Sequence, residues 1–193
     1  TSPVLSNHDT DEVLYVLEGS CNVVIGEDEY EVGPDTGVYL RPGQTLRVEN
    51  NESEVVRFIS SQCPAEPVKP VKLPPIVKLA DRRALPTADR WYRVLVDDEI
   101  GSEQVTQFVG SIPPGRAPDH FHEYEEVLFI LRGEGRMWAG ETHTLIVAGS
   151  CIYLPRGQVH CVENTGSGEL RLLGIFYPAG SPAVRYEAAD ERG

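Results

Sequence analysis

The stretch that decides the fold is GRAPDHFHEYEEVLFILRG, from Gly115 to Gly133. It places His120 and His122 two residues apart, and Glu126 follows across a short turn. In an extended segment, residues two apart point to the same face, so both imidazoles can converge on one point. Glu126 has the same parity as the two histidines. We therefore expect the three side chains to face one interior.

A second stretch, GSCIYLPRGQVHCVEN over residues 149–164, supplies a third imidazole from His160. Three histidines and one carboxylate form a nitrogen and oxygen ligand set that suits Fe, Mn, Ni, Cu or Zn better than Ca or Mg. The structural alternative is two chance histidines on a strand and a third in a hairpin. We predict one divalent transition metal ion per chain, of unknown identity, with the ligands His120, His122, Glu126 and His160.

Together the two stretches resemble the paired signature of the cupin superfamily, G(X)5HXH(X)3–4E(X)6G followed by G(X)5PXG(X)2H(X)3N. In the first half, four rather than five residues separate Gly115 from His120, which affects a loop and not a ligand. The second half fits without a gap, through Gly149, Pro155, Gly157, His160 and Asn164. The resemblance implies a β jelly-roll barrel with all four metal-ligand positions filled.

An internal repeat sets the number of barrels. A shift of 114 positions superposes His8 on His122 and Glu12 on Glu126. The same shift aligns several further identities, namely Gly19 with Gly133, Gly26 with Gly140, Tyr39-Leu40 with Tyr153-Leu154, Gly43-Gln44 with Gly157-Gln158, and Val48-Glu49-Asn50 with Val162-Glu163-Asn164. Because one register holds over this length without a gap, the chain resembles a bicupin with two barrels in tandem.

The chain is rich in short strand-like runs that end at Gly, Pro, Asn and Asp. The clearest runs are Val13–Leu17, Cys21–Ile25, Gly37–Leu40, Glu54–Ile59, Val127–Leu131 and Leu170–Phe176. No long stretch has a helical period. We predict an all-β fold of two tandem antiparallel jelly-roll barrels with few short helices.

Proline content suggests where the barrels are joined. Cys63–Pro75 contains five prolines, which favour a stiff extended connection. We predict an N-terminal barrel over residues 1–62, a linker over 63–90, a C-terminal metal-binding barrel over 91–180 and a tail over 181–193. Nothing in the first copy matches the strands expected over Tyr92–Pro114. Either residues are missing upstream or other segments fill those places.

The two copies differ in the residues that would bind metal. Ser6 stands where the second copy has His120, and Leu46 stands where it has His160. The remaining two candidates, His8 and Glu12, would leave an ion mostly solvated, so we predict that the first barrel has lost its metal. His8 and Glu12 would then hydrogen-bond each other inside a small core, or line a pocket that binds a small molecule without metal.

Several other residues have ordinary structural interpretations. His143 falls on a hairpin outside both motifs and is expected at the surface. Cys161 follows His160, so it should point away from the metal as an inert buried thiol. Tyr153 has a counterpart, Tyr39, in the first copy, which favours a structural role for both. Four arginines could bind an anionic substrate or simply be solvated, and these are Arg116, Arg132, Arg136 and Arg156.

Composition limits the classes of partner. The net charge of −13, from 17 basic and 30 acidic residues, argues against binding to nucleic acid or acidic membranes. No apolar run approaches the roughly 18 residues of a membrane-spanning helix. The four cysteines form no CxxC pair, which favours reduced thiols in a cytoplasm. The sequence begins with Thr1, so a removed secretion signal stays open.

The predicted site supports more than one function. We expect a metal-dependent enzyme of small-molecule metabolism, foremost a dioxygenase or other oxidoreductase acting on an enol, diketone or phenolic substrate. The alternatives are a non-catalytic protein that binds metal and a small ligand, or a metal-dependent isomerase, decarboxylase or aminohydrolase. The jelly roll is shared by all of these classes, so the fold does not decide between them. No catalytic residue beyond the metal ligands can be named.

The sequence also predicts how the second barrel is covered. Val127, Phe129 and Leu131 alternate out of phase with Glu126, so they should face away from the metal. Either the first barrel or a second chain has to cover them. We expect a homodimer, in which the two barrels of one chain can already pair with each other.

Overall fold

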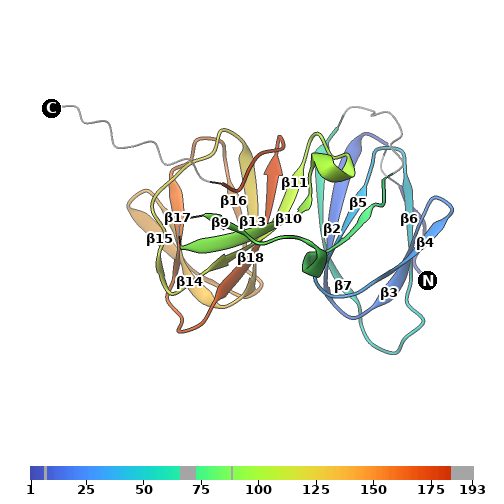
Figure 1. The fold of residues 1–193 in the computed structure, drawn as a ribbon, viewed down its shortest axis with the longest axis horizontal. Helices are drawn as coiled ribbons and strands as arrows, with labels where there is room; N and C mark the ends of the chain where they lie inside the picture. Colours follow the sequence, from blue (N-terminus) through green and yellow to red (C-terminus); the bar gives the residue numbers. More distant parts are fainter. Residues whose placement is uncertain (7, 66–72, 88, 184–193) are drawn as a thin grey trace.

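The computed structural model describes residues 1–6, 8–65, 73–87 and 89–183. Figure 1 shows two β-barrels side by side, with β10 (Arg90–Val96) and β11 (Thr106–Ile112) of the second barrel on the side that faces the first. In the described residues, helix is limited to two single 3-10 turns, η1 (Leu79–Asp81) and η2 (Asp98–Ile100). The predicted fold class, two antiparallel jelly-roll barrels with few short helices, is confirmed.

The first barrel consists of two antiparallel sheets. One has the order β1-β6-β3-β4, with the bounds β1 (Leu5–Ser6), β6 (Thr45–Glu49), β3 (Cys21–Ile25) and β4 (Asp28–Val32). The other has the order β7-β2-β5-β8, with the bounds β7 (Arg57–Pro64), β2 (Thr10–Glu18), β5 (Thr36–Leu40) and β8 (Ile76–Lys78). On β3, side chains alternate between buried and half-buried, so Cys21, Val23 and Ile25 point into the core.

The second barrel also consists of two sheets, one of them larger. The strands of the six-stranded sheet are, in order, β16 (Cys151–Leu154), β13 (Glu125–Arg132), β18 (Leu170–Tyr177), β11 (Thr106–Ile112), β10 (Arg90–Val96) and β9 (Leu85–Thr87). The strands of the four-stranded sheet are, in order, β12 (Gly115–Arg116), β17 (His160–Asn164), β14 (Glu134–Ala139) and β15 (Thr142–Val147).

The internal repeat appears in the strand order. The run β7-β2-β5 in the first barrel matches β18-β13-β16 in the second. On its other side β18 pairs with β11, whereas β7 pairs only with β2 among the described residues. At the opposite edge, β8 pairs with β5. The first barrel therefore lacks counterparts of β10 and β11 among the described residues, and a segment from the predicted linker extends its other edge.

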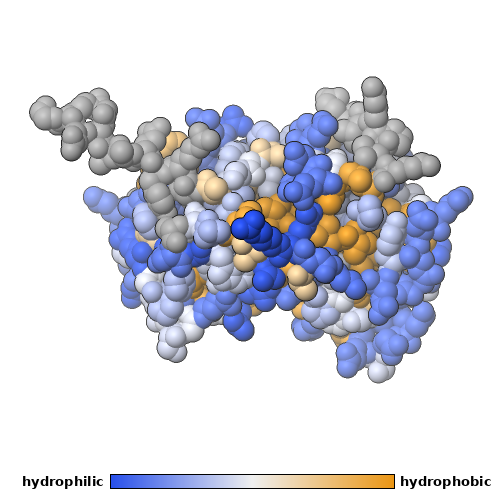
Figure 2. All heavy atoms as spheres, in the orientation of Figure 1, coloured by the Kyte–Doolittle hydropathy of each residue, from blue (hydrophilic) through white to orange (hydrophobic). Residues whose placement is uncertain are grey.

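The barrels contact each other through the β7-β2-β5-β8 sheet of the first barrel and the six-stranded sheet of the second. A shared apolar core joins residues from both, among them Val13 and Tyr15 of the first barrel and Leu95 and Val109 of the second. Phe129 packs against this core, as does Leu131. On the face in Figure 2, hydrophobic residues gather where the barrels meet. The apolar face predicted to need a cover thus has one within the chain, and the homodimer stays a prediction.

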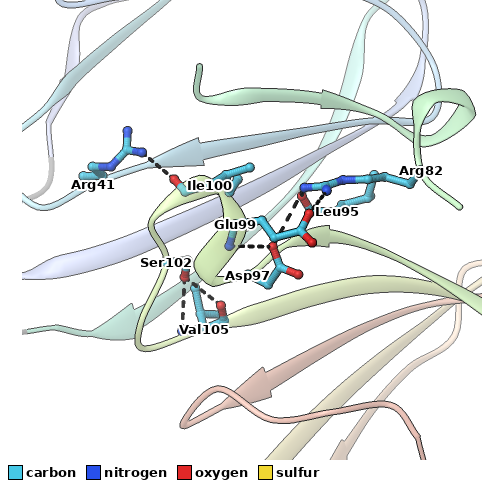
Figure 3. A network of polar contacts seen from close by, with 8 residues as sticks. All are labelled: Arg41, Arg82, Leu95, Asp97, Glu99, Ile100, Ser102 and Val105. Carbon is cyan, nitrogen blue, oxygen red and sulfur yellow. Dashed lines mark hydrogen bonds and ion pairs between the residues drawn. The ribbon is translucent and has the colours of Figure 1, made fainter. Parts of the chain in front are cut away.

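Polar contacts surround this apolar core. Arg41 of the first barrel donates from Nη2 to the carbonyl oxygen of Ile100 at 2.6 Å, and Figure 3 shows this bond beside η2. At the other side of η2 in this view, Arg82 contacts Glu99. Across the barrels, Arg171 Nη2 lies 3.2 Å from Asp35 Oδ2. Hydrogen bonds and ion pairs therefore connect the two barrels in addition to apolar packing.

Some of the predictions lie outside the described residues. The proline-rich connection falls largely on residues 66–72, and the tail largely on 184–193. The division into domains at 62, 90 and 180 stays a prediction. All four cysteines are free thiols. In the described part of the chain, no helix is long and apolar enough to cross a membrane.

Candidate metal centre

Backbone pairing brings the two motifs together. His120 precedes β13 in a segment outside the named strands, yet it forms an antiparallel bridge with His160 at the start of β17. The two residues exchange both backbone hydrogen bonds, at 3.0 and 2.8 Å. Residues opposite each other in such a bridge place their side chains next to each other on one face.

A tight turn in the second motif fixes the other side of the site. Gln158 N donates to Pro155 O at 3.1 Å, which closes a four-residue turn with Gly157 in its third position. Gly157 has φ +77°, a value that a type II turn requires there and that glycine adopts without strain. Gly157 N then donates to His122 O at 2.8 Å, so the turn holds the backbone of the first motif.

The three predicted histidines converge. One ring nitrogen from each of His120, His122 and His160 lies within 4.8 Å of the others. Their ring centroids are 4.4 to 5.5 Å apart. His160 is 3 % exposed and His122 is 9 % exposed. Among the described residues, this is the one cluster of three or more His, Cys, Asp or Glu side chains close enough to share an ion.

Glu126, at the start of β13, lies beside the cluster of three histidines but is not part of it. Its side chain is buried, and Oε2 lies 3.2 Å from His160 Nε2 and 3.7 Å from His122 Nε2. No hydrogen bond with good geometry reaches Oε2 from the described residues. A buried carboxylate oxygen without an aligned donor is unfavourable unless a cation balances it. The donor set therefore fits a divalent transition metal ion.

Hydrogen bonds at the far side of two rings select the tautomer that binds metal. His160 Nδ1 lies 2.7 Å from Gln158 O, and His120 Nδ1 lies 3.1 Å from Pro118 O. A carbonyl oxygen can only accept, so Nδ1 carries the proton in both rings. The lone pair of a neutral ring is then on Nε2. This arrangement orients Nε2 as a ligand atom, as carbonyl partners of metal-binding histidines do.

Burial keeps two of the rings neutral. Burial, together with a smaller effect of neighbouring His160, lowers the pKa of His120 and of His122 to about 4. Burial also lowers the pKa of His160, but the nearby carboxylate of Glu126 outweighs this and leaves the pKa raised. A charged imidazole cannot ligate a metal, so His160 is the ring at which protons compete most with an ion.

The candidate site opens into a small cavity of about 90 Å³ inside the second barrel. Its walls are mainly apolar and include Tyr92, Phe108, Leu128 and Phe176. Arg90 also lines it, a residue that the sequence analysis did not single out. Its parity with Tyr92, which opens the predicted strand, was the signal that could have found it, because residues two apart on a strand share a face.

The first barrel has no matching cluster among its described residues. His8 is exposed at the surface, so the prediction that His8 and Glu12 pair inside a core is wrong. Glu12 is buried and accepts a hydrogen bond from Ser60 Oγ. Leu46, in the place of His160, is 1 % exposed and belongs to the apolar core of this barrel. An apolar side chain thus fills the position of the missing imidazole.

Other residues considered from sequence lie away from the site. Cys161 is fully buried, and Arg116 Nε contacts its sulfur at 3.3 Å, on the side opposite His160; burial raises the pKa of this thiol. His143 is exposed and packs on Trp138. Tyr39 is buried and donates a hydrogen bond to Asp11, which fits the predicted structural role. Tyr153 is 58 % exposed, so the burial of Tyr39 does not extend to its counterpart.

The remaining arginines considered as anion ligands are surface or sheet residues. Arg116 stacks over Trp138 at 4.1 Å from the ring centroid. Arg132 pairs with Glu169, and Arg136 pairs with Glu163. None of these side chains lines the cavity beside the three histidines.

Known proteins share this fold. The chain is similar to a mutant of oxalate decarboxylase from Bacillus subtilis, with a TM-score of 0.75 and 18 % identity over 92 % of this chain and 66 % of that chain. It is also similar to a putative glyoxylate-induced protein from Pseudomonas aeruginosa, with a TM-score of 0.76 and 18 % identity over 92 % of this chain and 74 % of that chain. At this level of identity the likeness concerns the fold alone.

Sequence relatives cover shorter stretches. Auxin-binding protein 1 of Arabidopsis thaliana is 34 % identical over 86 residues, which are 39 % of this chain and 43 % of that protein. The oxalate-binding protein of Thermotoga maritima is 36 % identical over 67 residues, which are 34 % of this chain and 55 % of that protein. The match thus spans about half the length of these two relatives. The model of the Cupin domain matches residues 1–61 and 108–176, more than half of the chain. The chain therefore belongs to the Cupin domain family.

Proposed function

We propose that this chain is a metal-dependent bicupin enzyme whose second barrel holds one divalent transition metal ion through His120, His122, Glu126 and His160. The observation that carries the proposal is the convergence of three imidazoles beside a buried carboxylate that lacks an aligned donor. Such an ion, when bound, polarises a coordinated oxygen atom and lowers the pKa of coordinated water.

The reaction that the site supports best is cleavage of a carbon–carbon bond in a small, oxygen-rich substrate. Decarboxylation has the support of the fold neighbours, because the similar oxalate decarboxylase contains Mn(II) centres. Dioxygenase action on an enol, diketone or phenolic substrate is the other form of such a cleavage. Here the chain itself supplies apolar walls, including Phe108 and Phe176, that exclude water and orient a small molecule against the site.

The experiment starts from protein purified without chelator. Elemental analysis and electron paramagnetic resonance identify the ion, and carbon dioxide release and oxygen uptake are then followed with oxalate and with small diketones and phenols. Turnover should require the ion, disappear in His160→Ala and persist in His143→Ala, a histidine outside the site. Equal turnover in the wild type and His160→Ala would overturn the proposal.

A second candidate is a non-catalytic metal and ligand binding protein. It is favoured by two sequence relatives that are binding proteins by name, for auxin and for oxalate. Saturable binding of a small molecule that depends on the metal, without carbon dioxide release or oxygen uptake for any substrate tried, would favour this candidate over the enzyme.

A further inference from the structure

Arg90 faces the same cavity as the candidate metal centre. It begins β10, where it shares a face with Tyr92, a residue of the second barrel's core. The Arg90 side chain is only 12 % exposed. The cavity is lined by Arg90 together with all three histidines and Glu126. A largely buried arginine thus belongs to the wall of the proposed substrate pocket.

The guanidinium of Arg90 has little compensation from the protein. Its one ion-pair contact among the described residues joins Nε to Asp89 Oδ1 at 3.2 Å, and Asp89 is 66 % exposed. That contact lacks hydrogen-bond geometry, and Nε is otherwise buried without a partner in the described residues. Arg93 on the same strand also has a buried Nε without a partner, but its Nη1 donates to Leu79 O at 3.1 Å, whereas Arg90 has no hydrogen bond from its side chain among the described residues. A buried cation without a well-formed partner is unfavourable, so a ligand that pairs with Arg90 would gain affinity.

The charged side chains around the cavity indicate the sign of the ligand's charge. Apart from the three histidines, Arg90 and Glu126 are the only charged side chains among the described residues of its lining. Their charges cancel, so a divalent ion at the histidines would leave a net positive pocket with apolar walls. In such surroundings an attraction between opposite charges is much stronger than in water. The ligand should therefore be an anion.

The geometry of the guanidinium indicates which anionic group of the ligand it would bind. Its N–H donors form a planar fork that matches the two oxygens of a carboxylate, and this pairing is shorter and stronger than neutral hydrogen bonds. The cavity of about 90 Å³ leaves room for a small ligand only.

We propose that Arg90 recognises a carboxylate of the substrate, so that the substrate is a small dicarboxylate held between the metal centre and Arg90. This inference rests on the proposed function, because the second carboxylate is the one directed at the metal. Arg90 is a specificity residue in this account. The sequence motifs of the metal site do not include it.

The test measures whether Arg90 and one ligand carboxylate depend on each other. Calorimetric titrations of the full, metal-loaded chain use oxalate, malonate and succinate, each beside its monoamide. For the dicarboxylate that binds best, Arg90→Gln should weaken binding at least tenfold, and it should weaken binding of the matching monoamide less than threefold. Arg93→Gln, on the same strand but outside this cavity, should change neither affinity more than twofold. Arg90→Lys, which keeps the charge without the fork, should recover part of the loss.

The outcomes separate this inference from the proposed function. Equal weakening for the dicarboxylate and its monoamide, or no weakening at all, would overturn the role of Arg90. Metal content is measured on every variant, and absence of metal from the wild type would overturn the proposed function instead. The titrations are repeated on chelated protein, so the dependence on Arg90 is measured in either case. Should Arg90→Gln fail to fold, Arg90→Lys alone must show a greater loss for the dicarboxylate than for the monoamide.

Discussion

His120 and His160, forty residues apart, form one antiparallel backbone bridge with hydrogen bonds of 3.0 and 2.8 Å. This pairing sets two imidazoles side by side by means of the backbone alone. In the first barrel, the equivalent strands instead pair Leu5 with Leu46 and Ser6 with Thr45. The same architecture thus presents two imidazoles at this pairing in the second barrel and none at the corresponding pairing in the first.

Acid should destabilise the metal-free protein through two of the histidines. The pKa of His120 and of His122 is about 4 when folded, against 6.5 ordinarily. Between these values the unfolded chain binds more protons, so stability should fall as pH drops from 6.5 to 4. His160, with a raised pKa, contributes stability that is full below 6.5 and is lost as pH rises through its folded pKa. Urea unfolding of chelated protein from pH 4.5 to 7.5 checks this, and His122→Gln should flatten the acid side. An unchanged acid slope in that variant would contradict the assignment.

Gly174 has to be glycine because a phenyl ring covers it. It pairs with Phe108 across β11 and β18, and a Cβ at Gly174 would lie 2.2 Å from Phe108 Cζ. Gly174→Ala should therefore displace Phe108 in the cavity wall and cost about 1–3 kcal/mol of unfolding free energy. Gly168→Ala is the control, since a Cβ there meets nothing within 4 Å, and it should stay within about 0.5 kcal/mol. Urea unfolding measures both, and equal costs would refute the packing argument.

Packing rather than charge should hold the two barrels together. The Asp35–Arg171 ion pair crosses the interface, but Asp35 is 47 % exposed, so Arg171→Ala should cost less than about 1 kcal/mol. Leu95 is fully buried in the shared core, and Leu95→Ala should cost about 2–5 kcal/mol. The two variants are compared by denaturant unfolding of the whole chain. A larger loss in Arg171→Ala than in Leu95→Ala would reverse this ranking.

A homodimer remains our prediction for the assembly. The apolar residues that first suggested it pack on the first barrel, yet Leu145 and Val147 on the edge strand β15 are 75 % and 54 % exposed. Such an edge favours association with a second chain. Sedimentation velocity at micromolar concentration should show a dimer that Leu145→Lys weakens. A monomer in the wild type would mean that the pairing of barrels within the chain is sufficient.

Much of the fold and the candidate site follows from local patterns. The alternation at His120 and His122 and the turn glycine Gly157 are short-range features, so they predict which side chains share a face. The repeat extends the same argument to the first barrel and locates Leu46 in its core. Strand ends were less predictable, since the strand expected from Glu54 begins at Arg57.

Features that depend on contacts between distant segments could not be predicted. Arg90 lies before the first motif. Its parity with Tyr92 indicates only that the two side chains share a face, and the pairing of β10 with β11 places that face beside a cavity made by other strands. Tyr39 and Tyr153 occupy equivalent places in the repeat, but only Tyr39 is buried. The repeat implies equal surroundings for such a pair, and the packing of one barrel on the other makes them unequal.

Metal binding should stabilise the second barrel. An ion that binds only the folded chain adds about 2.7 kcal/mol at a free concentration 100 times its dissociation constant. For a chain of this size, each kcal/mol shifts the melting temperature by about 2–4 °C, so chelation should lower it by about 5–10 °C. The shift should vanish in His160→Ala, and His8→Ala, in the first barrel, should keep it.

Metal content per chain tests the central claim most directly. Elemental analysis of unchelated wild type, His160→Ala and His8→Ala is the decisive comparison, because the two variants remove one histidine from each barrel. The account predicts one ion per chain in the wild type and in His8→Ala, and a loss of most of the ion in His160→Ala. Two ions per chain, or a loss of metal in His8→Ala but not in His160→Ala, would contradict it.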